Sequence, residues 1–204
     1  VVYSCLHPHY TTQGYTIDDI RAVGGLDKNA DEAGHGTAEA ANILAVAPGA
    51  TLSLVKANKN GVSYPLAGFQ AAKQHQNPHI ISCSWGLLGP EPGLALEIAD
   101  AVASGVVVVF SAGNKGVTDD PSAVKFSVTH PALISVGGAY PINGGGFRAS
   151  NIASSFDSFV YTNPQRHVPD VVGLVGEMPR AILIMLPTQP GSDHDVNFAS
   201  SGAF

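Results

Sequence analysis

Charged residues are scarce in this sequence. They make up 13% of it, with 10 Lys and Arg against 16 Asp and Glu and a formal net charge of -6. Because no basic residues cluster, the sequence lacks the electrostatic footprint of a nucleic-acid-binding protein. No apolar run reaches the length that crosses a membrane, and no leader peptide is recognisable in the sequence. We therefore expect neither a nucleic-acid nor a membrane partner, and we assign no compartment.

Cysteines and metal-binding patterns are sparse as well. Cys5 and Cys83 are the two cysteines. They are too few for a disulfide scaffold, and two buried free thiols are the simpler interpretation. The histidines other than His35 show no metal-ligand spacing with cysteines or carboxylates. We expect no metal site among them, and we interpret as surface or turn residues His7, His9, His75, His79, His130, His167 and His194.

Hydrophobic residues are abundant by contrast, at 45%, which is typical of a globular chain with a substantial core. We expect one domain over residues 1–204. Periodicity and turn residues predict helices over 37–47, 66–75 and 94–104. They predict strands over 51–55, 79–84, 106–110, 133–136 and 181–186. Alternating strands and helices imply right-handed crossovers, so the expected fold is three-layer α/β: a mostly parallel sheet with helices on both faces.

The segment around residue 106 gives two sharper expectations. Gly105 follows the helix expected over 94–104 and is placed to act as its C′ residue. The run from Val106 to Phe110 is β-branched up to its last residue and unbroken, which is typical of a strand buried on both faces.

Two motifs carry residues suited to acyl-transfer chemistry. In Gly34-His35-Gly36-Thr37 a histidine stands at the entrance of an expected helix, where its imidazole can act as a general base. Asn114 follows the apolar run over 106–110, where its side-chain amide can stabilise an oxyanion. The alternatives are a surface or turn histidine and a turn asparagine before Gly116.

A series of blocks along the chain resembles the subtilisin-like serine proteases (subtilases). The blocks follow one another in order: Gly34-His35-Gly36-Thr37, Val46-Ala47-Pro48-Gly49-Ala50, Ile80-Ile81-Ser82-Cys83-Ser84-Trp85-Gly86, residues 106–114, and Leu133-Ile134-Ser135-Val136-Gly137. One triplet alone is weak, but five blocks at suitable spacings are specific. The resemblance implies a seven-stranded parallel sheet, a Ser-His-Asp triad and endopeptidase activity on polypeptides. It also implies that His35 is the general base and Asn114 the oxyanion donor.

The same resemblance identifies two segments that line the substrate. These segments are Ser84-Trp85-Gly86 and Ser111-Ala112-Gly113. An extended peptide is expected to lie between them as an added strand, held by backbone hydrogen bonds. Trp85 is larger than the leucine usual in its block, which implies narrower or more aromatic subsites; the alternative is an ordinary core aromatic residue.

Two catalytic positions depart from the family pattern. Tyr3 stands where the triad aspartate is expected, and a tyrosine with a pKa of about 10 supplies no anion near neutral pH. We interpret the acidic residues between Tyr3 and His35 as solvated loop charges; the alternative is that one of them substitutes for the triad carboxylate. These residues are Asp18, Asp19, Asp27 and Asp31. No Gly-Thr-Ser motif is present, and Ser200 and Ser201 lack its context.

From these departures we expect a subtilase domain whose C-terminal part is missing and which ends before the nucleophile-bearing helix. We therefore expect the 204-residue chain to be inactive by itself. The resemblance places that helix against the sheet, so strands such as 106–110 are expected to keep an apolar face uncovered. The alternative is a pseudoprotease or peptide-binding module that keeps the groove without catalysis.

An unrelated small-molecule α/β enzyme has less support. Such an enzyme would need a phosphate loop, and Gly144-Gly145-Gly146 lacks the dinucleotide spacing. Subtilases often bind structural calcium, but Asp119-Asp120 and Asp193-His194-Asp195 are too sparse to assign a site, so we expect no cofactor. The resemblance makes the strands near Cys5 and Cys83 neighbours, which leaves a disulfide open if their Cα atoms lie within roughly 7 Å.

Overall fold

The computed structural model describes residues 13–31, 34–59, 62–75, 77–116, 126–177 and 180–181. The chain divides into two compact units. Unit 1 comprises Val1–Asn77 and Ile184–Phe204, and unit 2 comprises Pro78–Leu183. The expectation of one domain over residues 1–204 stays a prediction.

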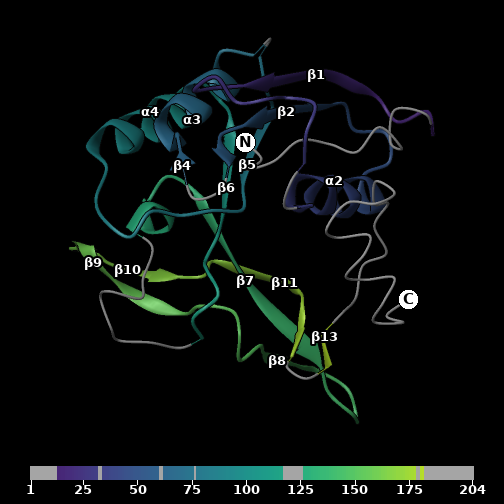
Figure 1. Cartoon of the computed structure of the whole chain (residues 1–204). Coiled ribbons are helices and arrows are strands. Elements are labelled where there is room, and N and C mark those ends of the chain that lie inside the picture. The colour runs from purple at the N-terminus through teal and green to yellow at the C-terminus, as the bar shows by residue number, and fades with distance from the viewer. Residues whose placement is uncertain are drawn as a thin grey trace. The chain divides into compact units, whose positions relative to one another are not determined.

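Unit 1 combines two small sheets with two helices (Figure 1). Strands β1 (Ile17–Ala22) and β2 (Leu52–Lys56) pair in parallel, and β3 (Asn58–Lys59) and β4 (Val62–Ser63) form an antiparallel pair. Helix α2 (His35–Val46) follows β1, and α3 (Pro65–Lys73) follows β4. One hydrophobic cluster of this unit, formed by Ala40, Leu44 and Leu54, packs α2 against β2. The sequence predicts α2 and β2 here but not β1. The interpretation of Asp18 and Asp19 as solvated loop charges is wrong, because both lie in β1 and pair with His75 and Arg21 respectively.

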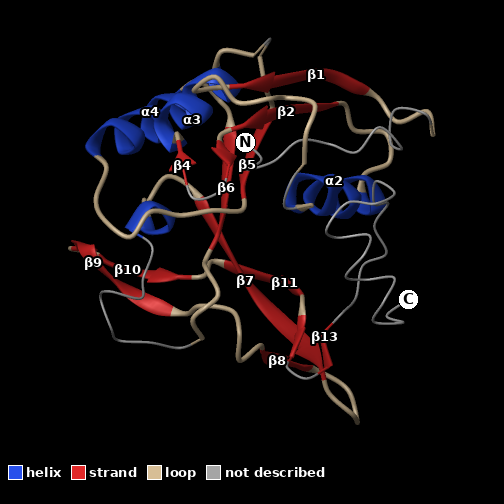
Figure 2. Cartoon of the chain, in the orientation of Figure 1, coloured by secondary structure: helices blue, strands red, loops and turns tan. Residues whose placement is uncertain are grey.

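Unit 2 is built on a mostly parallel five-stranded sheet (Figure 2). Its order is β11 (Val171–Leu174), β7 (Ile134–Pro141), β6 (Val107–Ser111) and β5 (Ile80–Cys83), and all these neighbours run parallel. Strand β8 (Phe147–Ala149) pairs antiparallel with β7. Strands β9 (Phe156–Thr162) and β10 (Gln165–Val168) form an antiparallel pair, as do β12 (Gly176–Glu177) and β13 (Arg180–Ala181). The mixed α/β fold with a mostly parallel sheet is therefore confirmed. Only Ala181 of the strand expected over 181–186 is described.

Helix α4 (Pro92–Ala103) shows how local sequence fixes both of its ends. Pro92 occupies the first helical turn, where its missing N–H costs no hydrogen bond. The carboxylate of Glu91 accepts a hydrogen bond from Leu94 N–H at 2.8 Å. At the other end Gly105 has φ 88. The N–H groups of Gly105 and Val106 donate to the carbonyls of Val102 and Ala101, both at 3.0 Å, as in a Schellman motif. The expected role of Gly105 is confirmed.

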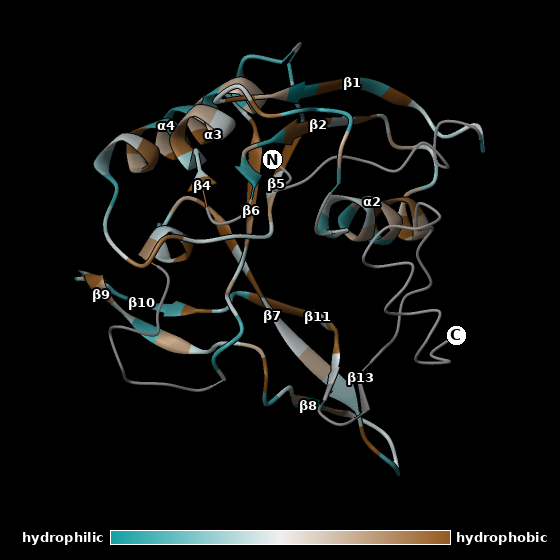
Figure 3. Cartoon of the chain, viewed as in Figure 1, coloured by the Kyte–Doolittle hydropathy of each residue, from teal (hydrophilic) through white to brown (hydrophobic). Residues whose placement is uncertain are grey.

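Strand β6 is buried on one face only, so the expectation of burial on both faces is wrong. Val108 is 1% exposed and Phe110 is 0% exposed, whereas Val107 is 43% exposed. The apolar surface continues on neighbouring strands, where Ile80 is 62% and Ile134 39% exposed. Figure 3 shows hydrophobic residues along β6. That a missing helix would cover such a face, as the subtilase resemblance implies, stays a prediction.

Two histidines contradict the interpretation as surface or turn residues. His130 is 9% exposed, and the side chain of His75 is 13% exposed. The His75 ring lies among polar partners: its Nδ1 lies 3.0 Å from the Arg21 guanidinium, and its Nε2 lies 2.7 Å from Asp18 and 2.8 Å from Ser53. Because a guanidinium only donates, Nδ1 accepts and the proton of the neutral ring sits on Nε2. This tautomer cannot activate Ser53 as a nucleophile.

Within the described residues, no helix is both long enough and apolar enough to cross a membrane.

Asp170 ties three strands of unit 2 together. Its N–H donates to Ser135 O at 2.8 Å, and its Oδ2 accepts from Ser135 N–H at 2.7 Å. The Arg166 guanidinium bonds both carboxylate oxygens of Asp170 and also the carbonyls of His167 and Leu133. The bond from Arg166, opposed by burial, holds the pKa of Asp170 below its ordinary value, with further help from the Ser135 N–H.

The two faces of β6 predict different costs of truncation. We expect Val108→Ala to lower the free energy of unfolding by about 2 kcal/mol, because it leaves a cavity in a packed core. The matched variant Val107→Ala removes a half-exposed side chain from the same strand and should cost less than about 1 kcal/mol. Denaturant melting of both variants measures the difference. Equal costs would mean that Val107 is covered in solution.

Asp170 also predicts a pH dependence of stability. The pKa of Asp170 is lower in the folded state than in the unfolded state, where it is about 4. The stabilisation by the ionised carboxylate is therefore fully present above about pH 4, and it is lost as the pH falls through the folded-state pKa. The difference in unfolding free energy between the wild type and Asp170→Asn should therefore be largest near pH 6 and shrink towards about pH 2.5. A difference that stays constant over this range would contradict the contribution of the ionised carboxylate.

Candidate active site

His35 is the first residue of α2, and the glycine before it makes this position accessible. Gly34 is the N-cap residue with φ 67 and ψ -1, a left-handed conformation that side chains disfavour. Its carbonyl accepts the first helical hydrogen bond, from Ala38 N–H at 3.0 Å. The chain thus turns sharply into the helix and places the His35 ring at its N-terminal end, as the motif predicts.

Asp31 fixes this turn. Its Oδ2 accepts hydrogen bonds from the N–H of Thr37 at 2.9 Å and from the hydroxyl of Thr37 at 2.6 Å. Its carbonyl accepts from Gly34 N–H at 3.4 Å. The interpretation of Asp31 as a solvated loop charge is therefore wrong: its carboxylate satisfies a donor that the start of a helix leaves open.

Lys56 anchors the same loop to the sheet. This residue at the end of β2 is 0% exposed, and its Nζ donates to Ala30 O at 2.8 Å. Because burying an ammonium without acceptors is costly, the carbonyl that receives this bond is held in place. The described residues Ala30 and Asp31 are therefore bonded to β2 and to α2, respectively.

The His35 side chain is partly exposed, and one of its two ring nitrogens is buried. Its side chain is 39% exposed, and Nε2 lies 3.7 Å from the carboxylate of Glu39 on the next turn. Within the described residues, Nδ1 is buried and has no hydrogen-bond partner. Such a ring can exchange a proton through Nε2, while Nδ1 faces a position that suits a hydrogen-bond acceptor. Asp31 Oδ1 is likewise buried without a partner among the described residues, but its other oxygen already serves α2.

Asn114 lies in a loop that begins where β6 ends. Ala112 N–H donates to Val136 O at 2.8 Å, and Gly113 O accepts from Ser154 N–H at 2.9 Å. The hydroxyl of Ser154 accepts from Lys115 N–H at 2.9 Å. These bonds tie the loop on both sides of Asn114, which is itself exposed. A fixed backbone with an exposed amide side chain suits a hydrogen-bond donor to a ligand.

The segment Ser84–Gly86 follows β5, next to β6 in the sheet. Trp85 is 7% exposed, and its ring packs edge-on against Phe110, with centroids 5.0 Å apart and planes at 74°. Trp85 therefore belongs to the core of unit 2. This favours the interpretation of Trp85 as an ordinary core aromatic residue over a role in shaping the subsites. The preceding Cys83 is a buried free thiol. Its burial raises the pKa to about 12, which excludes a reactive thiolate at neutral pH.

The residues expected at the site belong to different parts of the chain. His35 lies in unit 1, while Asn114 and both substrate segments lie in unit 2. Their meeting in one cleft stays a prediction, since each unit is described by itself. Outside the described residues lie Tyr3, Cys5, Ser200 and Ser201. No group of three or more His, Cys, Asp or Glu among the described residues could hold a metal ion.

Asp31 and Lys56 are the residues that sequence reasoning missed. The available signal was short-range: an aspartate six residues before Thr37 and four before His35 is placed to cap the first turn of the helix. Lys56 gave a weaker signal, as a charged residue that ends an otherwise apolar strand. Both support the position of His35 rather than the chemistry itself.

Comparison with known proteins gives consistent matches. The model of the subtilase family matches residues 8–178. Subtilisin DY of Bacillus licheniformis is 32% identical over 140 residues, covering 58% of this chain and 50% of that protein. Subtilisin E of Bacillus subtilis (strain 168) is 33% identical over 122 residues, covering 57% of this chain and 29% of that protein. The chain thus spans at most half the length of these two relatives.

Solved structures share the fold. A crystal structure of a lanthipeptide protease superposes with a TM-score of 0.66 at 18% identity and covers 89% of this chain and 56% of that one. Sphericase superposes with a TM-score of 0.61 at 14% identity and covers 100% of this chain and 77% of that one. At these identities the likeness concerns architecture.

The Asp31 cap predicts a specific cost for its removal. We expect Asp31→Ala to lower the free energy of unfolding by about 1–2 kcal/mol, because the first turn of α2 loses the acceptor for two donors of Thr37. Asp27→Ala is the matched control, since Asp27 also accepts from a backbone N–H, that of Asn29 at 2.9 Å, but in an exposed loop. That control should cost less than about 0.5 kcal/mol. Equal losses in denaturant melting would contradict a structural role of Asp31 at the start of α2.

Proposed function

Because the chain belongs to the subtilase family, we propose that it is a protease-type domain that receives an extended polypeptide between Ser84–Gly86 and Ser111–Gly113. In this proposal His35 is the general base and Asn114 the oxyanion donor of peptide-bond hydrolysis. The observation that carries it is the placement of His35: a half-exposed imidazole at the start of α2 with a buried Nδ1.

His35 would take the proton of an attacking hydroxyl through Nε2. That role needs the other proton on Nδ1, held by an acceptor, so that Nε2 keeps its lone pair. The Nδ1 atom is buried and has no partner among the described residues, which supports this role because it leaves room for one more hydrogen bond at the required nitrogen. The loop tied by Asp31 and Lys56 would keep the ring in position during proton transfer.

Asn114 would donate its side-chain amide to the oxygen of the tetrahedral intermediate. Its exposure, in a loop fixed by Ser154, supports this role. In a subtilisin, a relative of this chain, loss of such a donor costs about 3 kcal/mol of transition-state stabilisation. Strands β5 and β6 are neighbours in the sheet, so the two segments that follow them leave the same edge.

Two sequence features bear on activity. Tyr3 stands where the resemblance places the triad aspartate, and loss of that carboxylate lowers turnover by about 10⁴ in a serine protease. No Gly-Thr-Ser motif occurs in the 204 residues. We therefore propose that this chain by itself does not cleave peptides. Tyr3 also favours a second function, peptide binding without catalysis.

We expect no turnover of a chromogenic tetrapeptide and no labelling by a serine-directed fluorophosphonate when the chain is incubated with either reagent. An active subtilisin in the same buffer is the positive control. Stoichiometric labelling of one serine, located by mass spectrometry, would overturn the proposed inactivity and point to a nucleophile that the sequence does not reveal.

Peptide binding tests the groove independently of catalysis. An extended hexapeptide should bind in calorimetric titration, and Gly86→Val should weaken binding at least about tenfold by blocking the approach of the backbone. Gly89→Val is the matched control, because a Cβ at Gly89 meets nothing within 4 Å. Loss of binding in both variants, or in neither, would contradict the assignment of Ser84–Gly86 as a substrate segment.

A further inference from the structure

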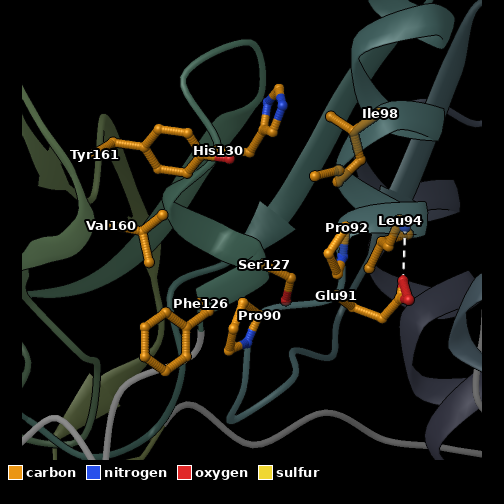
Figure 4. Close-up of a pocket in the computed structure, with 11 residues that line it drawn as sticks. Pro90, Glu91, Pro92, Leu94, Ile98, Phe126, Ser127, His130, Val160 and Tyr161 are labelled. Atoms are coloured by element: carbon orange, nitrogen blue, oxygen red, sulfur yellow. Dashed lines mark hydrogen bonds between the residues drawn. The ribbon is translucent and has the colours of Figure 1, made fainter.

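Unit 2 contains a cavity of about 200 Å³ that the proposed catalytic residues do not line. It lies between the first turns of α4, the short helix η1 (Phe126–Thr129) and the end of β9 (Figure 4). Leu94 and Ile98 of α4 form one wall, and Phe126 and Val160 form part of the opposite wall. His130 and Tyr161 lie at one end.

The size of the cavity limits its ligand to about one ring. An engineered protein cavity of about 150 Å³ accommodates benzene, whereas drug-sized molecules occupy pockets of about 300–1,000 Å³. A volume of about 200 Å³ lies between these values. It suits a molecule with a single aromatic ring or a small fused ring.

The end of the cavity formed by His130 and Tyr161 is polar but carries no charge near neutral pH. His130 Nδ1 accepts a hydrogen bond from Ala132 N–H at 3.2 Å, so the proton of the neutral ring sits on Nε2. Burial, helped by Arg166, lowers the pKa of His130. Burial raises the pKa of Tyr161. The two rings pack edge to face with centroids 5.7 Å apart, an arrangement that aromatic groups favour.

Among the described residues of the wall, Glu91 is the remaining ionisable group. The Glu91 carboxylate accepts from Leu94 N–H at the start of α4. An anionic ligand would be repelled by this carboxylate. A charged molecule would also lose its hydration in a mostly apolar space. These costs favour an uncharged ligand.

We propose that this cavity binds a small uncharged aromatic molecule, of the size of phenol or indole. The wall is connected to the proposed substrate segment: Phe126 N–H donates to Leu87 O at 2.9 Å, and Leu87 N–H donates to Ser127 Oγ at 3.0 Å. A ligand that contacts Phe126 and Ser127 therefore touches the two residues that hydrogen-bond to Leu87, the residue directly after Gly86. Binding itself does not depend on the proposed function.

The test is a titration of the full 204-residue chain with phenol and with indole, followed by ¹H–¹⁵N NMR. We expect saturable shifts at the first turns of α4, at η1, at the end of β9 and at Leu87. Ala95→Phe fills the cavity from α4 and should weaken binding at least about tenfold, that is by about 1.4 kcal/mol or more. Ala99→Phe adds the same ring at an exposed position of the same helix and should leave binding unchanged.

Further ligands test whether the cavity excludes charged molecules and whether it takes a free molecule or the side chain of a polypeptide. Benzoate and benzylamine should bind at least about tenfold more weakly than phenol. N-acetyltyrosine amide stands for the aromatic side chain of a polypeptide. Tighter binding of phenol than of this amide identifies a small-molecule site. Tighter binding of the amide overturns the proposal of a small-molecule site. Should Ala95→Phe fail to give a folded spectrum, Ala95→Leu replaces it. No saturable shift in the wild type, shifts elsewhere in the chain, or equal binding of the charged analogues would overturn the proposal.

Discussion

The buried ammonium of Lys56 is the constraint on which the site in unit 1 depends. A charge with no exposed surface needs oxygen acceptors at fixed positions, because an unsatisfied ammonium in the interior is strongly destabilising. One of these is the carbonyl of Ala30, directly before Asp31. Asp31 in turn bonds Thr37 in the first turn of α2. Hydrogen bonds from β2 and from α2 thus hold the residues that precede His35. The position of His35 depends on these bonds as well as on helix propensity.

The sequence predicted the elements that depend on periodicity and on local stop signals. The three helices appear within two residues of their expected ends, and Gly105 ends α4 because only a residue tolerant of positive φ fits there. Helix α4 begins earlier than expected because Pro92 starts a helix although it cannot continue one. Periodicity describes the order of apolar and polar side chains within one segment. It therefore could not predict that one face of β6 is exposed. Exposure of Val107 depends on what packs against the sheet, which the strand itself does not encode.

The candidate site was predictable to a smaller extent. The motifs predicted His35 at the start of a helix and Asn114 after a strand, and both positions are observed. In unit 2 the segments after β5 and β6 leave the same edge of the sheet, because the two strands pair in parallel. Sequence could not distinguish a solvated aspartate from the Asp31 cap, because the difference lies in the hydrogen bonds to Thr37. The cavity beside His130 was equally hidden. Its walls come from α4, η1 and β9, which are distant in the chain.

Trp85 has an optical consequence. It is the one tryptophan of the chain and is buried against Phe110 in unit 2. Excitation at the red edge of aromatic absorption therefore reports the environment of unit 2 without a contribution from a tryptophan in unit 1. Backbone circular dichroism reports both units. If the two signals change together during unfolding, the units form one cooperative structure, and if they separate, unit 2 has a stability of its own. An unmodified chain thus carries its own spectroscopic marker for one of its two parts.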